Sequence, residues 1–405
     1  MCRLIDPRGF SLRVQPAQTP VRVVLWPVQR RVPRGWARIT PKTQAMPGAE
    51  FGNDATKIER YRAFWNRTAV SRPLVGFTCV GWFPFAEFSA CRSFPPDSQL
   101  DASQVDPIAF LEDQVRILRE GEVMDDDLIR GACPGQIAIP WLPAALGSPL
   151  RVLPENILGE ERALSWPEVL ATRLDLDNPW CRKYFEFADV LVAASAGRFP
   201  VSHSAELGPT DLHALLRGHT QSLLDLVDWP SESEQILRRG GALLRDFTKA
   251  VWKRLPLFEN GYFDAQYSLW APGPIVRMQE DATAVYSPRL YRRFVQPVDR
   301  VLAGEFASSF IHLHSTSMFL LDAILEIEQI QCYEVNNDAL GPPLAKLLPH
   351  LQSIQAHGKP LLVRGSFTPE QLRLVMDSLE SRGLFLNIMV ADLAETEPLR
   401  RIAGC

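Results

Sequence analysis

The sequence lacks any apolar run that approaches the roughly 18 residues needed to cross a bilayer. It also lacks a Cys-x-x-Cys pair, although it contains seven cysteines. An odd, scattered set of this kind is typical of reduced thiols and offers neither a disulfide framework nor a zinc ribbon. We therefore expect a soluble, cytoplasmic protein that does not associate with membranes.

Two nucleotide-binding signatures are absent as well. No Gly-x-Gly-x-x-Gly follows an early predicted strand, and no phosphate-binding loop of the Walker type occurs. These absences argue against the open sheets that bind nucleotides. The formal net charge of -4 argues against general binding of nucleic acid, so no nucleic-acid partner is expected.

Acidic residues are nearly missing from the first 45 residues, which contain nine Lys and Arg, six prolines and one acid. Neither helical nor strand periodicity persists there, so we predict that residues 1–46 form an irregular basic extension. An organelle transit peptide is one interpretation, although the segment is rich in proline rather than amphipathic. A translated upstream region that ends before Met46 is the alternative.

Regular alternation of helices and strands begins near residue 54. Predicted strands lie near residues 74, 124, 200, 260, 310, 331, 362 and 386. Strict alternation requires parallel strands with helices outside, and eight strands favour a (β/α)8 TIM barrel over an open sheet. We predict an α/β fold with a single barrel domain over residues 54–403.

Several helix starts are marked by capping residues. Asp106, Ser287 and Thr368 each precede a proline, a combination that places an N-cap residue before proline at the first helical position. The run 231–234, SESE, indicates a capping box before a long amphipathic helix.

The segment 310–317, FIHLHSTS, carries the strongest functional signal. Side chains alternate along a strand, so His312 and His314 share one face where a predicted strand ends. In a barrel, chemistry gathers at the C-terminal ends of the strands. Two such imidazoles suit metal binding, acid–base catalysis or contact with a substrate carboxylate, and structural packing is the remaining alternative.

Other polar and aromatic residues are candidates for the same site. Glu206, at the end of a predicted strand, and Asp264 are candidate catalytic residues. Candidate substrate-binding residues are Trp270, Arg277, Arg364 and Asn336. The tryptophan offers an aromatic wall, the arginines offer charge for an anionic group, and the asparagine lies in the loop after a predicted strand. The alternatives are helix capping for Glu206, closing of the barrel for Trp270, a surface salt bridge for Arg277 and turn formation for Asn336.

Six fragments in order carry a family resemblance: IERYRAFWNRTAVSRPLV, PWLPAALGSPLRV, ELGPTDLHALLRG, EDATAVYSPRLYRRFVQPVDRVL, FIHLHS and QCYEVNND. Together they resemble the uroporphyrinogen decarboxylase (URO-D) superfamily, which includes cobalamin-linked methyltransferases of the methylcobalamin:coenzyme M type. The resemblance spans about residues 55–400. It implies a TIM barrel, and it is less specific for the reaction than for the superfamily.

The methyltransferase branch implies a metal. In that branch a His-x-Cys on the strand that matches FIHLHS, with a later Cys, binds zinc, which activates a thiol. His312 matches the His, His314 stands at the place of the Cys, and the later Cys is missing. The resemblance thus implies His312, His314 and a carboxylate as ligands, which suit zinc and equally iron or manganese. The carboxylates considered are Glu280, Asp281, Glu206 and Glu334, with Glu280 the first choice.

The decarboxylase branch matches less well. Its substrate-organising Asp corresponds to Ala138, and no Arg-rich segment of its kind occurs near residue 60. The leading hypothesis is a metal-assisted methyltransferase with a corrinoid or thiol acceptor. The alternatives are a metal-free decarboxylase of uroporphyrinogen or another carboxylated substrate, and a non-catalytic barrel that binds a tetrapyrrole or corrinoid. A small-molecule substrate, a corrinoid protein as partner and a homodimer are compatible with the resemblance.

Overall fold

The structure of this chain is a computed structural model that describes residues 50–79 and 84–405. The described residues all belong to one compact unit, which begins at Ala45 and extends to Cys405. The predicted basic extension, residues 1–46, lies outside the described residues. The predicted domain, residues 54–403, lies within this unit.

A six-stranded parallel sheet is the main element of this unit. Its strand order is β1-β11-β10-β9-β8-β7. The strands are β1 (Leu74–Thr78), β7 (Ile275–Gln279), β8 (Ser308–His314), β9 (Cys332–Asn337), β10 (Leu361–Gly365) and β11 (Leu384–Met389). Almost all of their residues are buried, as expected for a parallel sheet that is covered on both faces. The predicted α/β class is confirmed.

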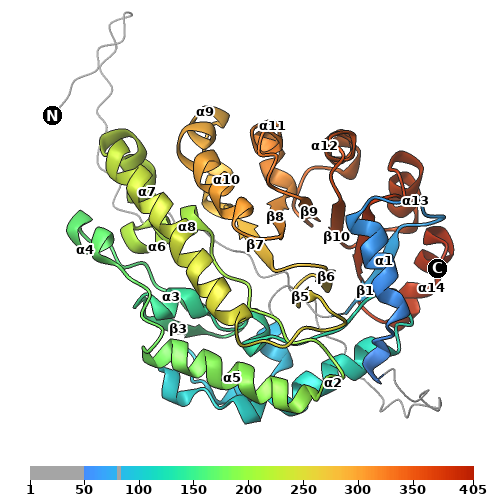
Figure 1. The fold of residues 1–405 in the computed structure, drawn as a ribbon, viewed down its shortest axis with the longest axis horizontal. Coiled ribbons are helices and arrows are strands. Elements are labelled where there is room, and N and C mark those ends of the chain that lie inside the picture. The colour runs from blue at the N-terminus through green and yellow to red at the C-terminus, as the bar shows by residue number, and fades with distance from the viewer. Residues whose placement is uncertain (1–49, 80–83) are drawn as a thin grey trace, which may run out of the picture. The chain divides into compact units, whose positions relative to one another are not determined.

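Helices connect consecutive strands in the second half of the chain. The helices α10 (Gln296–Gly304), α11 (Leu321–Leu325), α12 (Leu344–Ala356) and α13 (Pro369–Ser378) follow β7, β8, β9 and β10 in turn. Figure 1 shows these helices in an arc outside the strands, in the order of the chain. This arrangement is the series of βα units that the alternating pattern predicts.

The other described α-helices precede β7 in the chain, except α9, which lies between β7 and α10, and α14, which follows β11. They are α1 (Thr56–Trp65), α2 (Leu111–Glu122), α3 (Trp141–Ala145), α4 (Trp166–Ala171), α5 (Pro179–Ser195), α6 (Pro209–Arg217), α7 (His219–Asp228), α8 (Pro230–Trp252), α9 (Pro288–Leu290) and α14 (Thr396–Ala403). Among the described residues, none of the helices combines the length and the apolar character required to cross a membrane. A small antiparallel sheet contains β2 (Gln99–Leu100), β3 (Leu150–Leu153) and β4 (Asn156–Gly159).

Three of the four predicted caps are confirmed. The side chains of Asp106, Ser287 and Thr368 each accept a hydrogen bond from a backbone N–H two or three residues later. The capping box predicted at residues 231–234 is wrong, because α8 already begins at Pro230. Proline fixes φ at the first helical position, so the helix starts one residue before the serine that was expected to cap it.

The strands predicted near residues 74, 310, 331, 362 and 386 are confirmed as β1, β8, β9, β10 and β11. The segments near 124 and 200 form no regular strand in the described residues. Instead, Ala132 forms a parallel bridge with Val201, and His203 forms one with Asp264. Strand β7 was missed because Arg277 interrupts a run of only five residues. Closure into an eight-stranded barrel remains a prediction.

The strand predicted near residue 260 is half of an antiparallel hairpin, formed by β5 (Tyr262–Asp264) and β6 (Leu269–Ala271). The hairpin packs against buried residues near the N-terminal ends of the six sheet strands, which are Leu74, Ile275, Phe310, Cys332, Leu362 and Phe385. Because these contacts are apolar and buried, the hairpin belongs to the hydrophobic core at that end of the sheet.

Candidate metal centre

The two histidines lie where strand β8 ends. His314 is the last residue of the strand, and His312 precedes it by two residues, so both side chains point to the same face. His312 is buried, whereas the side chain of His314 retains 38% of its exposure. One ring of the pair thus lies in the protein interior, and the other is in contact with solvent.

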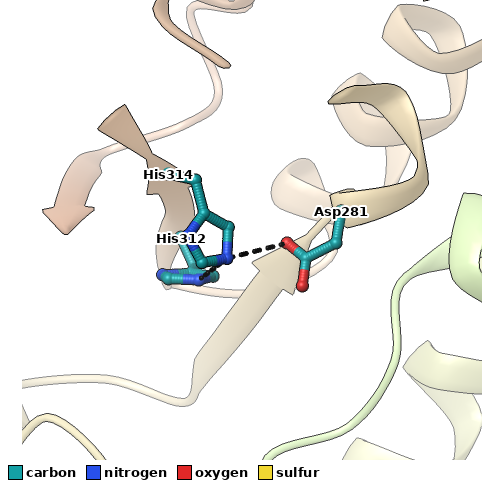
Figure 2. A group of neighbouring side chains, drawn as sticks. All are labelled: Asp281, His312 and His314. Atoms are coloured by element: carbon teal, nitrogen blue, oxygen red, sulfur yellow. Dashed lines mark hydrogen bonds and ion pairs between the residues drawn. The ribbon is translucent and has the colours of Figure 1, made fainter. Parts of the chain in front are cut away.

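The reactive nitrogens of the pair face each other. Nε2 of His312 lies 3.4 Å from Nε2 of His314, and Nε2 of His314 lies 3.8 Å from Oδ1 of Asp281. Figure 2 shows the aspartate reaching toward the two rings from the segment that follows β7. One donor atom from each of these three side chains lies within 4.8 Å of the other two. The arrangement is a compact N, N, O donor set.

The second ring nitrogen of each histidine is held by a carboxylate. Nδ1–H of His314 donates to Oδ1 of Asp338 at 2.9 Å. Nδ1 of His312 contacts Glu334, and the hydroxyl of Tyr267 lies 2.9 Å from the same nitrogen. A carboxylate behind an imidazole fixes the ring and its tautomer, an arrangement that recurs behind metal-binding histidines. Both Nε2 atoms are thereby left free to act as ligands.

The carboxylate of Asp281 is also oriented. The side-chain amide of Gln279 donates to its Oδ2 at 2.6 Å, which leaves Oδ1 as the atom nearest to His314. The aspartate side chain is 39% exposed, so packing alone does not hold it. Each of the three donor side chains thus has a hydrogen bond on the atom that faces away from the cluster.

The electrostatic environment differs between the two rings. Burial, together with the guanidinium of Arg277, lowers the pKa of His312 to about 3, so this imidazole is neutral. The hydrogen bond to Asp338 raises the pKa of His314 to about 9, because the carboxylate stabilises the charged ring. Burial raises the pKa of Glu334 to about 8. With the shared proton on Nδ1 of His312, its Nε2 presents a lone pair toward His314.

The donor set fits a divalent metal ion. Zinc–nitrogen bonds of about 2.0–2.1 Å in tetrahedral geometry separate neighbouring ligand atoms by about 3.4 Å. The two Nε2 atoms have this separation, Oδ1 of Asp281 lies 3.8 Å from Nε2 of His314, and the three donor atoms all lie within 4.8 Å of one another. Two imidazoles and one carboxylate suit zinc, iron or manganese.

The first choice for the third ligand, Glu280, does not reach the histidines. Its Oε2 accepts a hydrogen bond from the backbone N–H of Thr210 at 2.9 Å, at the start of α6. Residues next to each other at the end of a strand point in different directions, and it is Asp281 that lies beside His314. The structure thus brings Asp281, and not Glu280, beside the histidine pair.

The two predicted catalytic acids, Glu206 and Asp264, have other partners. Glu206 contacts Ser204 and accepts from the backbone N–H of Leu142 at 2.9 Å, and burial raises its pKa to about 7. Asp264 accepts from the backbone N–H of Tyr267 at 2.9 Å, which stabilises the turn of the hairpin. The described contacts bring neither carboxylate to the histidine pair.

Trp270 is not an aromatic wall of the site. Its side chain is 0% exposed and packs in the core at the opposite end of the sheet. The indole N–H donates to the carbonyl of Phe258 at 2.9 Å, and the guanidinium of Arg62 lies 5.0 Å from the ring centre. The structure places Trp270 away from the histidine pair because residue 270 belongs to β6, which turns it into the core.

The two arginines lie deep beside the histidines. Arg277 and Arg364 are buried, and their guanidinium carbons lie 5.7 Å and 5.5 Å from the ring centre of Tyr267. The Tyr267 hydroxyl in turn contacts His312, so the tyrosine links the arginines to the pair. A surface salt bridge, the alternative considered for Arg277, is excluded by this burial.

Asn336 is also close to the pair. It is buried and stands directly opposite His314 on β8 and Arg364 on β10. Its side-chain oxygen has no hydrogen-bond partner among the described residues. A buried amide oxygen without a partner costs about 1–3 kcal/mol, which a bound molecule would offset. Turn formation, the alternative interpretation, is excluded because Asn336 lies within β9.

Three contributing residues are not among the predicted site residues: Tyr267, Gln279 and Asp338. Asp338 follows β9 by one residue, so its position after a strand was a usable signal, although such residues also form turns. Gln279 ends β7, the strand that was missed. Tyr267 lies in the turn of the hairpin, and no pattern in the sequence indicates which end of the sheet that turn approaches.

Comparison with known proteins supports the fold. No protein-family model and no curated protein sequence matches this chain. Among solved structures, a methyltransferase from Methanosarcina mazei has a similar fold, with a TM-score of 0.59 and 11% sequence identity. The similarity covers 85% of this chain and 97% of the other. At this identity, the comparison establishes a common fold and leaves the reaction open.

Proposed function

We propose that this chain is a methyltransferase of the URO-D type, assisted by a divalent metal ion that His312, His314 and Asp281 hold. The observation that carries the proposal is the donor cluster, in which two Nε2 atoms lie 3.4 Å apart and both Nδ1 atoms are backed by carboxylates. The fold likeness to a methyltransferase supports the reaction class. The resemblance of FIHLHS to the metal-binding strand of the methyltransferase branch supports a corrinoid or a thiol as the acceptor.

We further infer that the six-stranded sheet continues into an eight-stranded barrel. The two parallel bridges at residues 132 and 203 support this inference. The backbone N–H of Asp127 also donates to the carbonyl of Val75 in β1 at 3.0 Å, which places the segment 127–132 at the free edge of that strand. In a closed barrel, the histidine pair would lie at the C-terminal mouth, where barrel enzymes carry their active sites.

The roles of the surrounding side chains follow from their contacts. A divalent ion at the cluster would supply Lewis-acid stabilisation of a thiolate at neutral pH. Asp338 and Glu334 orient the imidazoles, and Gln279 orients the carboxylate of Asp281. Arg277 and Arg364 would place an anionic group of the substrate above Tyr267, since both guanidinium groups are buried there.

The proposal is tested by metal content and by tracing the methyl group. Purified protein is analysed for zinc, iron and manganese, and then incubated with methylcobalamin and a small thiol. In the reaction a carbon–sulfur bond forms, the cobalt–carbon bond breaks with its electron pair left on cobalt, and the thiol proton is released. We expect about one metal ion per chain and methyl transfer that stops when the metal is removed.

The matched variants are the double substitution His312→Ala/His314→Ala and the control His357→Ala. His357 is exposed at the end of α12, outside the cluster. We expect the double variant to lose metal and activity and the control to keep both. Carbon dioxide release from uroporphyrinogen by metal-free protein would replace the proposal with a decarboxylase. Tetrapyrrole or corrinoid binding without either reaction would replace it with a non-catalytic barrel.

A further inference from the structure

Two segments that are far apart in the sequence cap each other near the candidate metal centre. One is the start of α6, residues 208–211, and the other follows β7, residues 279–282. Oδ1 of Asp211 accepts from the backbone N–H of Ala282 at 2.8 Å. In return, Oε2 of Glu280 accepts from the backbone N–H of Thr210 at 2.9 Å. Each segment therefore satisfies N–H groups that the other leaves without a helical partner.

This exchange is unusual because caps are normally local. The residues after β7 form a short 3-10 helix, η7 (Asp281–Val285), whose N-cap residue is Glu280. The side chain of Glu280 makes no cap for its own helix and bonds to α6 instead. The missing cap is supplied by Asp211 from α6. The position of Asp281 thus depends on a residue 70 positions earlier in the chain.

The two segments are in direct backbone contact. A Cβ atom on Gly208 would lie 1.4 Å from the carbonyl oxygen of Gln279, so no other residue fits there without moving one of the backbones. Gly208 N–H also approaches Oδ2 of Asp211, at 3.3 Å. Because the approach is close, a shift of α6 would be transmitted to the end of β7 and to Asp281.

Asp281 needs this support more than a core residue does. Its carboxylate is 39% exposed and is oriented by Gln279 alone among the described hydrogen bonds to its oxygens. Its backbone N–H lies 3.4 Å from Oδ2 of Asp211, and the next N–H donates to Oδ1 of the same carboxylate. Holding the backbone at two consecutive N–H groups restricts where the carboxylate can point.

We infer that Asp211 is a positioning residue for the metal centre, which holds the backbone of Asp281 so that Oδ1 faces the two histidines. This inference rests on the proposed function, since it assigns a purpose to the placement of one proposed ligand. Asp211 itself is not a ligand; it acts through Asp281.

The test measures the affinity of metal-free protein for cobalt(II), followed by visible absorption. We expect Asp211→Ala to lower the affinity by about 10- to 100-fold, the range typical of residues behind metal ligands. Asp211→Asn keeps one acceptor oxygen and should recover part of the loss. Once Asp281→Ala has removed the ligand, adding Asp211→Ala should cause no further loss, because residues that act through one another are not additive.

The matched control is Thr368→Ala, which removes the cap of α13, where Thr368 accepts from Gln371 N–H at 3.2 Å. Thr368→Ala should lower the free energy of unfolding, as Asp211→Ala does, and leave the cobalt affinity unchanged. Unchanged affinity in Asp211→Ala, or a further tenfold loss in the double variant, would overturn the inference. If Asp211→Ala does not fold, an unchanged cobalt affinity in Asp211→Asn would overturn the inference instead. Cobalt binding that survives loss of both histidines would instead refute the metal centre itself.

Discussion

The two ends of the parallel sheet differ sharply in chemistry. At the N-terminal ends of the strands, buried apolar residues meet the β5–β6 hairpin, and Trp270 lies fully inside this cluster. At the C-terminal ends, β7 ends in Gln279 and β8 ends in His314. Asp281 follows β7, Asp338 follows β9, and both carboxylates approach His314. The same strands thus carry stability at one end and donor groups at the other. We expect substitutions at the two ends to affect different measurements.

The largest effect is expected from His314→Ala. This change removes a candidate ligand at the polar end, so metal content should fall to trace and methyl transfer by more than about 100-fold. Its side chain is 38% exposed, so the free energy of unfolding of metal-free protein should fall by less than in Trp270→Ala, with the loss of the hydrogen bond to Asp338 as the main cost. Elemental analysis, the methyl-transfer assay and denaturant unfolding check the three expectations. Full methyl-transfer activity in this variant would contradict the expectation that the C-terminal end of the sheet carries the donor groups.

Trp270→Ala should produce the opposite pattern. Removing a fully buried indole at the apolar end should lower the free energy of unfolding by about 3–5 kcal/mol. Cobalt affinity of the folded fraction should stay within about twofold of wild type, since Trp270 touches no donor residue. Denaturant unfolding and cobalt titration measure the two quantities, and the smaller change Trp270→Phe provides a milder variant if Trp270→Ala is too unstable. A large loss of cobalt affinity with an intact fold would show that the two ends are coupled.

A smaller loss is expected from Asp338→Asn at the polar end. The carboxylate both accepts from Nδ1–H of His314 and contacts the backbone and hydroxyl of Ser315. Replacing it should weaken cobalt binding by about 10- to 100-fold, because the imidazole loses a charged partner. Asp322→Asn, at an exposed position on α11, is the matched control and should bind as wild type does. Equal affinity in both variants would mean that Asp338 does not support His314.

Per pH unit, the smallest effect is the pH dependence of cobalt binding. The hydrogen bond to Asp338 raises the pKa of His314 to about 9, and a ligand imidazole must be neutral. Protons therefore compete with the metal below pH 9, and affinity should rise by at most about tenfold per pH unit until His314 has lost its proton. In Asp338→Asn the rise should end at lower pH, because the charged ring loses its partner. A flat profile in wild type would contradict this account of the pair.

The sequence predicted the strands that alternate with helices most accurately, along with the location of the histidine pair. Strand β8 has seven residues, with Phe310, Ile311 and Leu313 as its apolar members, and the alternation rule then places His312 and His314 on one face. The neighbouring strands β9, β10 and β11 are likewise short runs that alternate with helices. These predictions succeeded because they depend on local periodicity, which the chain expresses without reference to distant residues.

The predicted residues that the structure places elsewhere lie at the ends of strands or in turns, where the path of the backbone decides which way a side chain points. Glu280 and Asp281 are adjacent acids, and only the path of the backbone after β7 decides which one turns toward His314. Trp270 follows a polar, aromatic segment that is compatible with a binding wall, yet the hairpin buries it. Arg277 interrupts an apolar run, which concealed the strand that carries it.

The sequence by itself determined the α/β class, the order of the βα units and the shared face of His312 and His314, because all three follow from hydrophobic patterns over a few neighbouring residues. Only the tertiary structure decided which acid completes the cluster, which carboxylates stand behind the imidazoles and which end of the sheet the hairpin covers. These outcomes arise from contacts between residues that are distant in the sequence, such as that of Asp211 with Asp281, 70 positions apart, and no local pattern encodes them.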